Sequence, residues 1–150
     1  MAGCTSGASP GKSNRKVAVV GGGFGGATTA KYLRMMDPSI EVTLVEPNST
    51  YYTCPFSNLV VGGVKGMPAI AHDCKTLQSK YGVNFLGAWA YQAKSNAVVL
   101  EDGAKVPFDQ DVLSPGVDIG YDKMPGHSQN IENKMTHSWK AGPQTMHLKR

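Results

Sequence analysis

A short apolar strand that runs into a glycine cluster constrains the fold of this chain more than any other feature. Residues 16–26 read KVAVVGGGFGG and contain the pattern G-x-G-x-x-G as Gly21, Gly23 and Gly26. In this pattern the first glycine turns the chain off the strand, and the second lets the backbone approach a pyrophosphate. The third lets the following helix pack closely on the strand. The N-terminus of that helix favours a bound anion. The cluster predicts a dinucleotide-binding β-α-β unit, although the pattern alone is a weak signal.

The residues around the cluster fit such a unit. Residues 17–20 are continuously apolar, which is typical of a buried parallel strand. We expect a helix over 25–36, because Asp37-Pro38 resists helical torsions and ends it. A second strand is expected over 41–46. Strand, glycine cluster, helix and strand then form one crossover unit of the expected size.

Glu46 ends the second strand, twenty residues after Gly26. A carboxylate at this place accepts hydrogen bonds from ribose hydroxyls and repels a 2′-phosphate. A ligand of the NADP type is therefore disfavoured. FAD and NAD both remain compatible with the pattern.

The rest of the chain predicts further short elements. The dipeptide Asp102-Gly103 is a strong hairpin turn, and Gly82 is a helix stop. Together the segments indicate an α/β fold with a mainly parallel sheet and a small antiparallel insert. In chain order we expect a loop with a helical turn over 47–66, a helix over 69–81 with Ile70, Cys74, Leu77 and Tyr81 on one face, a strand over 83–86, a hairpin of 97–101 and 105–108, and a strand over 111–114.

Composition narrows the function classes. Charged residues are 17% of the 150, the formal charge is +4, and no basic run is interleaved with aromatics, so nothing supports a nucleic-acid partner. No apolar run approaches the length of a transmembrane segment. The three cysteines form no C-x-x-C, and neither they nor the four histidines have a metal-ligand spacing. Residues 1–15 are expected to be a disordered linker or the remnant of an export signal.

Cys54 lies in the segment YYTCPFSN, in a loop that could fold back over the ring end of a dinucleotide. From its chemistry alone it could be a redox thiol, a covalent flavin ligand or a small buried hydrophobe. We expect Cys74 to be a small buried helix residue, and Trp89 and Trp139 to pack in the interior rather than contact a cofactor. Asp111 falls on a strand that we expect to be buried, where a lone carboxylate is costly unless the strand lies at an edge.

Five segments resemble, in the same order, the flavoprotein subunit of flavocytochrome c sulfide dehydrogenase. They read KVAVVGGGFGGATTAKYL, DPSIEVTLVEPN, YYTCPFSN, DVLSPGVD and HSWKAGPQT, and the resemblance covers roughly residues 15–145. It implies a Rossmann-like FAD-binding domain of the pyridine nucleotide-disulfide oxidoreductase type. That domain would span 16–119 and be incomplete, with 120–150 as the start of a truncated second domain. At Cys74 the family usually has an aromatic residue, and at Asp111 an aliphatic one.

The resemblance also implies the cofactor and its contacts. The cofactor would be FAD, and Cys54 matches the cysteine that forms a thioether to the flavin 8α-methyl carbon. The residues implied in cofactor binding are the glycine cluster (Gly21, Gly22, Gly23, Gly25, Gly26), Glu46 at the adenosine ribose, Cys54, Ala90 as a second adenine-side contact, and the turn Ser114, Pro115, Gly116.

In the complete family enzyme, which is periplasmic, hydrosulfide reacts at a redox disulfide beside the flavin. Electrons then pass through FAD to a separate c-type cytochrome subunit, and sulfur or polysulfide is formed. Both cysteines of that disulfide would lie beyond residue 150, so we expect no catalytic residue in this chain and no activity of the fragment alone. The alternatives are a fragment of a sulfide:quinone or NADH-linked flavin oxidoreductase, and a non-catalytic nucleotide-binding module.

Overall fold

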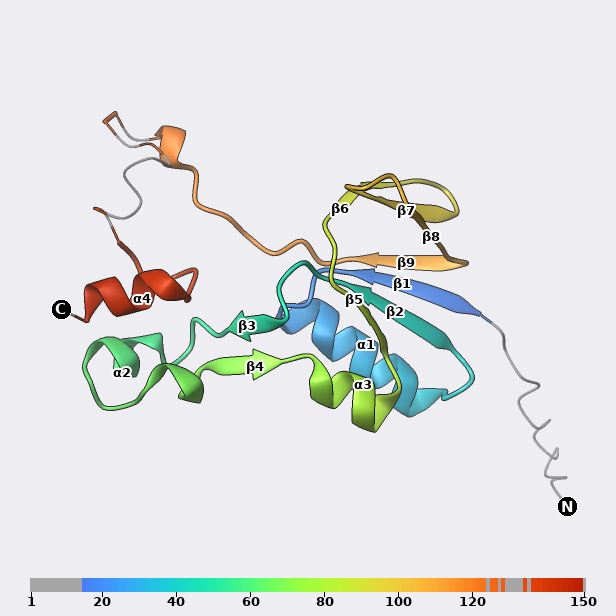
Figure 1. Ribbon diagram of the computed structural model, residues 1–150, viewed down its shortest axis with the longest axis horizontal. Helices are drawn as coiled ribbons and strands as arrows, with labels where there is room; N and C mark the ends of the chain where they lie inside the picture. The colour runs from blue at the N-terminus through green and yellow to red at the C-terminus, as the bar shows by residue number, and fades with distance from the viewer. Residues whose placement is uncertain (1–14, 124, 127, 129–133, 135, 150) are drawn as a thin grey trace, which may run out of the picture.

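The structure, a computed structural model, describes residues 15–123, 125–126, 128, 134 and 136–149 (Figure 1). Short strands predominate, and α1 is the longest helix in the described part of the chain. The elements are β1 (Lys16–Val20), α1 (Phe24–Met36), β2 (Glu41–Val45), β3 (Thr50–Tyr52), α2 (Ser57–Val61), the 3-10 turn η1 (Met67–Ala69), β4 (Ala71–Asp73), α3 (Lys75–Tyr81), β5 (Asn84–Leu86), β6 (Ala90–Ala93), β7 (Ala97–Leu100), β8 (Lys105–Pro107), β9 (Gln110–Leu113), η2 (Tyr121–Lys123) and α4 (Pro143–Leu148).

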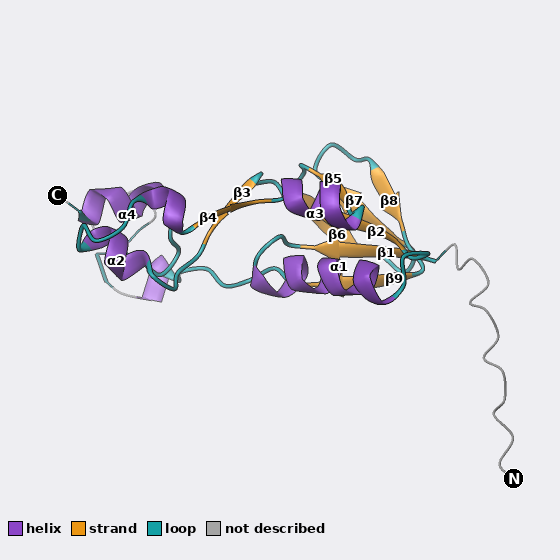
Figure 2. Ribbon diagram, turned by 90° about the horizontal axis from the view of Figure 1, so that it is seen from below, coloured by secondary structure: helices purple, strands orange, loops and turns teal. Residues whose placement is uncertain are grey.

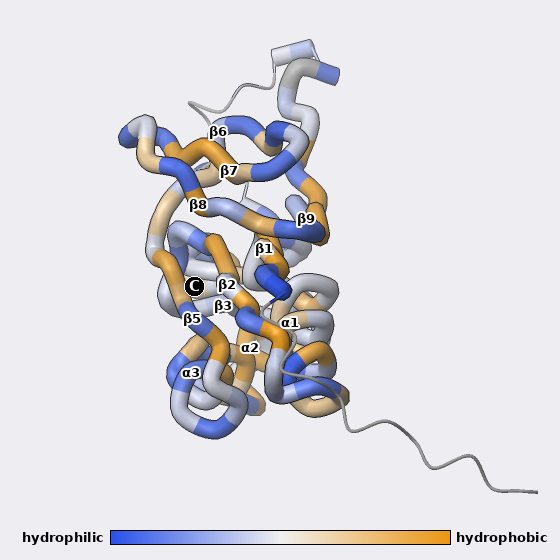
Figure 3. The backbone as a smooth tube through the Cα atoms, turned by 90° about the vertical axis from the view of Figure 1, so that its right-hand side faces the viewer, coloured by the Kyte–Doolittle hydropathy of each residue, from blue (hydrophilic) through white to orange (hydrophobic). Residues whose placement is uncertain are grey.

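A four-stranded parallel sheet in the order β5-β2-β1-β9 forms the centre of the molecule. Val19 in β1 is aligned with Leu44 in β2 on one side and with Val112 in β9 on the other. Parallel strands that are covered on both faces read as continuous apolar runs, as residues 17–20 of β1 do; in β2, Thr43 lies among the apolar Val42, Leu44 and Val45. Figure 3 shows this hydrophobic character along β1 and β2.

Each face of the parallel sheet has its own core cluster. Val17 and Val19 point to the face covered by α1 and α3, while Ala18 between them points to the other face, which the antiparallel sheet β6-β7-β8 covers (Figure 1). The period of two along a strand explains this division. The first cluster contains Val17, Val19, Ala30, Val42, Leu44, Cys74 and Val83. The second contains Ala18, Val45, Val98, Leu100 and Phe108.

A smaller lobe lies beyond the carboxyl ends of β1 and β2. The two-stranded antiparallel ribbon β3-β4 leads to it, and α2 and α4 lie side by side there (Figures 1 and 2). Ser57 of α2 and Thr145 of α4 are both buried. The Ser57 hydroxyl donates a 3.3 Å hydrogen bond to the carbonyl of Ser138. The lobe therefore joins residues from the middle of the chain to residues near its C-terminus.

The expected elements are confirmed for the β-α-β unit, for the helical turn within 47–66, which is α2, and for the strand–hairpin–strand order after residue 82. The helix expected over 69–81 is wrong in its first half. Residues 71–73 form β4, which pairs with β3, and the helix begins only at Lys75. Strands β3 and β6 and helix α4 were not expected from the sequence.

Four single-residue expectations have clear outcomes. Cys74 is buried, as expected, but it precedes α3 as its N-cap. Asp111 is exposed rather than buried, because β9 is the edge strand of the parallel sheet. Trp89 and Trp139 are 62% and 79% exposed, so the prediction that both pack in the interior is wrong.

Two further observations concern the described residues only. None of their helices combines the length and the apolar character needed to cross a membrane. Among the same residues, no group of three or more His, Cys, Asp or Glu side chains is placed to hold a metal ion. Apart from Arg15, the predicted N-terminal linker lies outside the described residues.

Candidate functional site

The glycine loop connects β1 to α1 at the carboxyl edge of the parallel sheet. Gly21 has φ +97°, which lets the chain turn, and its N–H donates a 2.9 Å hydrogen bond to the Val45 carbonyl. Helix α1 begins at Phe24 with Gly23 as its N-cap, and no side chain caps it. Its first turn also contains no acidic residue. The free N–H groups at this end and the helix dipole are therefore available to an anion.

Backbone atoms leave two glycines of the loop no room for a side chain, and a third has room only if a neighbouring side chain moves. A Cβ on Gly26 would lie 1.7 Å from the Gly21 carbonyl oxygen, and a Cβ on Gly21 would lie 2.0 Å from that of Ser114. A Cβ on Gly25 would lie 2.5 Å from the Ser114 hydroxyl. The loop, the helix and the turn after β9 thus meet at distances that only glycine permits. This is the cradle that the fingerprint requires, so these residues fit a dinucleotide pyrophosphate.

Glu46 is held directly against the glycine loop. Its Oε2 accepts a 2.8 Å hydrogen bond from the N–H of Gly22. Its Oε1 accepts hydrogen bonds from Asn48, at 2.9 Å from the main-chain N–H and at 3.0 Å from the side-chain amide. A carboxylate has about four lone-pair positions, so acceptor capacity remains for a further donor such as a ribose hydroxyl. Glu46 therefore lies at the loop, and its contact with a ribose stays a prediction.

The turn after β9 packs on the other side of the loop. The Ser114 N–H donates a 2.8 Å hydrogen bond to the Val20 carbonyl, which continues the β1–β9 pairing by one step. Pro115 and Gly116 follow as exposed residues, and Gly116 has φ +76°. The structure therefore brings together the glycine cluster, Glu46 and Ser114.

Cys54 lies after β3, where the chain enters the smaller lobe. It is half-buried, and its carbonyl accepts a 3.0 Å hydrogen bond from the Ser57 N–H. Tyr51, three residues before Cys54, lies beside the glycine loop, and its ring is 3.5 Å from the position of a Cβ on Gly23. Burial raises the pKa of the Tyr51 phenol, and the charge of a Cys54 thiolate raises it further. Sequence reasoning missed Tyr51, although the YYTC segment contained it.

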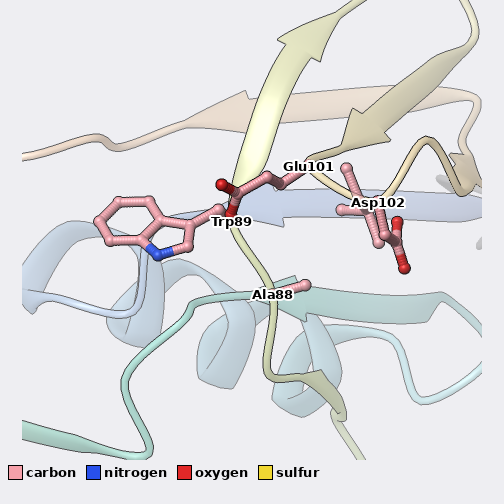
Figure 4. Close-up of a pocket in the computed structure, with 5 residues that line it drawn as sticks. Ala88, Trp89, Glu101 and Asp102 are labelled. Atoms are coloured by element: carbon pink, nitrogen blue, oxygen red, sulfur yellow. The ribbon is translucent and has the colours of Figure 1, made fainter.

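Ala90 occupies a different environment. It begins β6, is half-buried, and packs against the second core cluster. Within the described residues, no hydrogen bond joins Ala90 to the glycine loop. A hollow of about 350 Å³ lies near it, lined by Ala88, Trp89, Leu100, Glu101 and Asp102. Figure 4 shows the Trp89 and Glu101 side chains extending to one side of the β5–β6 connection and Asp102 to the other.

Cys74 borders a smaller hollow of about 230 Å³ that it shares with Ser49, Thr50, Asp73, Lys75, Gln78 and Phe85. Burial raises the pKa of the Cys74 thiol, and the nearby charges of Glu46 and Asp73 raise it further. This thiol therefore stays protonated near neutral pH and behaves as a small apolar group.

Together, the parallel β-α-β unit, a loop that needs glycine at Gly21 and Gly26, and an acidic residue hydrogen-bonded to that loop define a Rossmann-like dinucleotide-binding domain. Residues 15–143 match the family described as pyridine nucleotide-disulphide oxidoreductase. The chain belongs to this family of oxidoreductases, and membership implies a flavin cofactor. The predicted fold class is thereby confirmed.

Individual relatives agree with this family. The flavoprotein chain of sulfide dehydrogenase [flavocytochrome c] from Chlorobaculum thiosulfatiphilum is 72% identical over 46 residues, which are 31% of this chain and 96% of that protein. This match confirms the resemblance expected from the sequence. A mitochondrial sulfide:quinone oxidoreductase from Dictyostelium discoideum is 28% identical over 123 residues, or 80% of this chain and 27% of that protein. The chain thus spans about a quarter of the length of that second relative.

A solved structure supports the fold alone. The sulfide:quinone oxidoreductase of Aquifex aeolicus superimposes with a TM-score of 0.72 at 24% identity. The superposition covers 90% of this chain and 31% of the other.

Proposed function

We propose that this chain is the FAD-binding portion of a sulfide-oxidising flavoprotein. The observation that carries the proposal is the 72% identity to a sulfide dehydrogenase flavoprotein chain, in a molecule whose glycine loop fits a dinucleotide. The relative with 28% identity is a sulfide:quinone oxidoreductase, so the names of both relatives refer to sulfide. A direct test is whether the isolated chain binds FAD and whether the whole protein oxidises sulfide.

The binding roles follow from the geometry of the loop. Gly21, Gly23 and Gly26 would hold the pyrophosphate at the N-terminus of α1, and Glu46 would accept hydrogen bonds from the adenosine ribose. Gly22 and Gly25 would contribute backbone to the same cradle, and Ser114, Pro115 and Gly116 would border it. Ala90 would contact the adenine side. A bound flavin would accept two electrons from a donor and pass them on singly.

We propose further that Cys54 is bonded covalently to the flavin. Its thiol is half-buried and near enough to Tyr51, which borders the glycine loop, for a Cys54 thiolate to raise the pKa of the Tyr51 phenol, and this supports the assignment. The test is acid precipitation of the FAD-loaded protein. Flavin absorbance that stays in the pellet, and that is lost from the pellet in the Cys54→Ser variant, is the expected result. Flavin that is released completely into the supernatant would rule out the bond.

In the whole protein, electrons would pass to a c-type cytochrome subunit in the periplasm. Residues 16–119 would form the FAD-binding domain and 120–150 the start of the next. No residue of this chain would act on sulfide directly, because the reactive disulfide would be formed by other residues. Sulfide-dependent reduction of cytochrome c by the whole protein, and none by this chain alone, is the expected result. Reduction by the FAD-loaded chain alone would contradict it.

A second candidate, electron transfer to a quinone, is favoured by the match to a sulfide:quinone oxidoreductase over 80% of this chain. The two candidates differ in the acceptor. Rates with cytochrome c and with a soluble quinone, measured on the same preparation of the whole protein, decide between them. Faster reduction of the quinone would replace the cytochrome proposal.

A further inference from the structure

Tyr51 lies beside Gly23 in the glycine loop. Its ring carbon Cε2 lies 3.5 Å, and its hydroxyl 3.9 Å, from the position that a Cβ on Gly23 would occupy. Gly23 is the second glycine of the fingerprint, whose lack of a side chain lets a pyrophosphate come close to the backbone. The phenol therefore borders the same space that the pyrophosphate would enter.

The ring is fixed from two sides. It makes an edge contact with Phe24, the first residue of α1, with 5.5 Å between ring centroids and 80° between planes. Its backbone pairs with His72 in the β3–β4 ribbon. Edge-to-face aromatic pairs and ladder pairing both restrict ring position. Tyr51 is therefore oriented before any ligand binds.

The hydroxyl of Tyr51 is available. Within the part of the chain that the structure describes, it makes no hydrogen bond, whereas Tyr121 does. A phenol is protonated over the neutral range, and because the pKa of the Tyr51 phenol is raised by burial it stays so and can donate. A half-buried hydroxyl without a protein partner, beside a predicted anion site, is well placed to bond the anion.

We propose that Tyr51 is a cofactor-binding residue whose hydroxyl donates a hydrogen bond to the dinucleotide pyrophosphate above Gly23. This inference rests on the proposed function, because it requires a dinucleotide in the loop. It adds to the glycine cradle a side-chain donor from β3, on the strand that leads to Cys54. Tyr51 would thereby connect the pyrophosphate-binding loop with the segment that contains Cys54.

The test uses the full chain with Cys54→Ser, so that covalent attachment cannot mask an equilibrium. Tyr51→Phe keeps the ring and its contact with Phe24 and removes only the hydroxyl. Tyr52→Phe is the matched control, because the next side chain along a strand points to the opposite face. FAD is titrated into all three proteins, and the thermal midpoint of each apo protein is recorded.

Loss of a hydrogen bond to a charged group should weaken FAD binding by about tenfold or more in Tyr51→Phe. Binding by Tyr52→Phe should match the parent. The apo midpoint of Tyr51→Phe should stay unchanged, since the hydroxyl has no partner among the described residues. Unchanged affinity in Tyr51→Phe, or an equal loss in both variants, would overturn the inference while leaving FAD binding intact. A Cys54→Ser parent that binds no FAD would overturn the proposed function, and this inference with it.

Discussion

The main-chain N–H of Gly22 and Oε2 of Glu46 form a 2.8 Å hydrogen bond between residues 24 positions apart in the sequence. The contact is close enough that a Cβ on Gly22 would lie 2.7 Å from Cγ of Glu46. The glycine loop and the end of β2 therefore position each other before a ligand arrives. The acidic residue thus supports the cradle, in addition to the ribose contact that we propose for it.

Replacing this carboxylate by an amide should weaken both functions. In Glu46→Gln a single carbonyl oxygen remains to accept from Gly22, Asn48 and the ribose. We expect FAD affinity to fall by about tenfold, and the free energy of unfolding to fall by about 1 kcal/mol. FAD titration and urea unfolding measure the two effects. Glu41→Gln, at the exposed start of the same strand, serves as the control and should change neither. Equal behaviour of the two variants would contradict the role given to Glu46.

The close approach of Gly21 to Ser114 should make Gly21→Ala strongly destabilising. The added methyl would lie 2.0 Å from the Ser114 carbonyl oxygen, and φ at Gly21 is +97°. Strain and displacement of the turn should together lower the free energy of unfolding by about 2 kcal/mol or more. Gly87→Ala is the control, because its methyl would meet the Phe85 ring at an ordinary 3.6 Å. Urea unfolding that gives the same midpoint for both variants would rule out the close approach.

Arg34 should stabilise the fold through the shape of its guanidinium. Its Nε donates to the Tyr81 carbonyl at 2.9 Å and its Nη1 to the Ile40 carbonyl at 2.6 Å, so the end of α1 is tied to the end of α3 and the start of β2. Arg34→Lys keeps the charge but loses the planar fork. We expect a loss of about 1–3 kcal/mol in the free energy of unfolding. Arg15→Lys, an exposed arginine outside this arrangement, should lose almost nothing. A loss of unfolding free energy in Arg15→Lys with none in Arg34→Lys would refute the stabilising role of the Arg34 guanidinium.

The two described cysteines should differ sharply in reactivity. Cys74 is 8% exposed and its pKa is raised by burial, whereas Cys54 is half-buried. In a Cys4→Ser background near neutral pH, a disulfide reagent should modify Cys54 first and leave Cys74 until the protein unfolds. Modification of both at one rate would contradict this burial.

The same pKa shift gives a sign for the pH dependence of stability. A thiol whose pKa is raised in the folded state loses its proton more readily when the chain is unfolded. Its contribution to stability is therefore complete below the ordinary thiol pKa and is lost as pH rises toward the raised value. Between about pH 8 and about pH 10, the decline in unfolding free energy should be shallower in Cys74→Ala than in the parent. A steeper decline of the unfolding free energy in Cys74→Ala would contradict a raised pKa of the Cys74 thiol.

The central β-α-β unit could be predicted because its information is local. Continuous apolar residues define β1, Asp37-Pro38 ends α1, and Glu46 lies at the spacing that the crossover requires. The structure adds the close contacts of Glu46 with Gly22 and of Ser114 with Gly21. The spacing of these residues in the sequence does not predict the contacts. Those contacts depend on strands that are far apart in the sequence.

The segment 47–81 could not be predicted correctly, because its pairing is not local. Ile70, Cys74, Leu77 and Tyr81 have helical spacing and three of them do pack near α1 or its sheet, yet Ala71–Asp73 pairs instead with Thr50–Tyr52. Each strand of this ribbon has only three residues. Such a strand is too short to show an alternation of apolar and polar residues that would identify it in the sequence. Asp111 was misjudged for a related reason, since edge or central position depends on strand order rather than on local pattern.

The role of the glycine loop as the cofactor cradle is tested most directly by equilibrium binding of FAD to the 150-residue chain and to its Gly26→Ala variant, followed by flavin fluorescence. We expect saturable binding of one FAD by the unsubstituted chain. Gly26→Ala should bind none, because its methyl would lie 1.7 Å from the Gly21 carbonyl oxygen. Gly142→Ala, whose methyl would meet nothing within 4 Å, should bind as the parent does. No binding by the unsubstituted chain, or undiminished binding by Gly26→Ala, would contradict the glycine loop as the cofactor cradle.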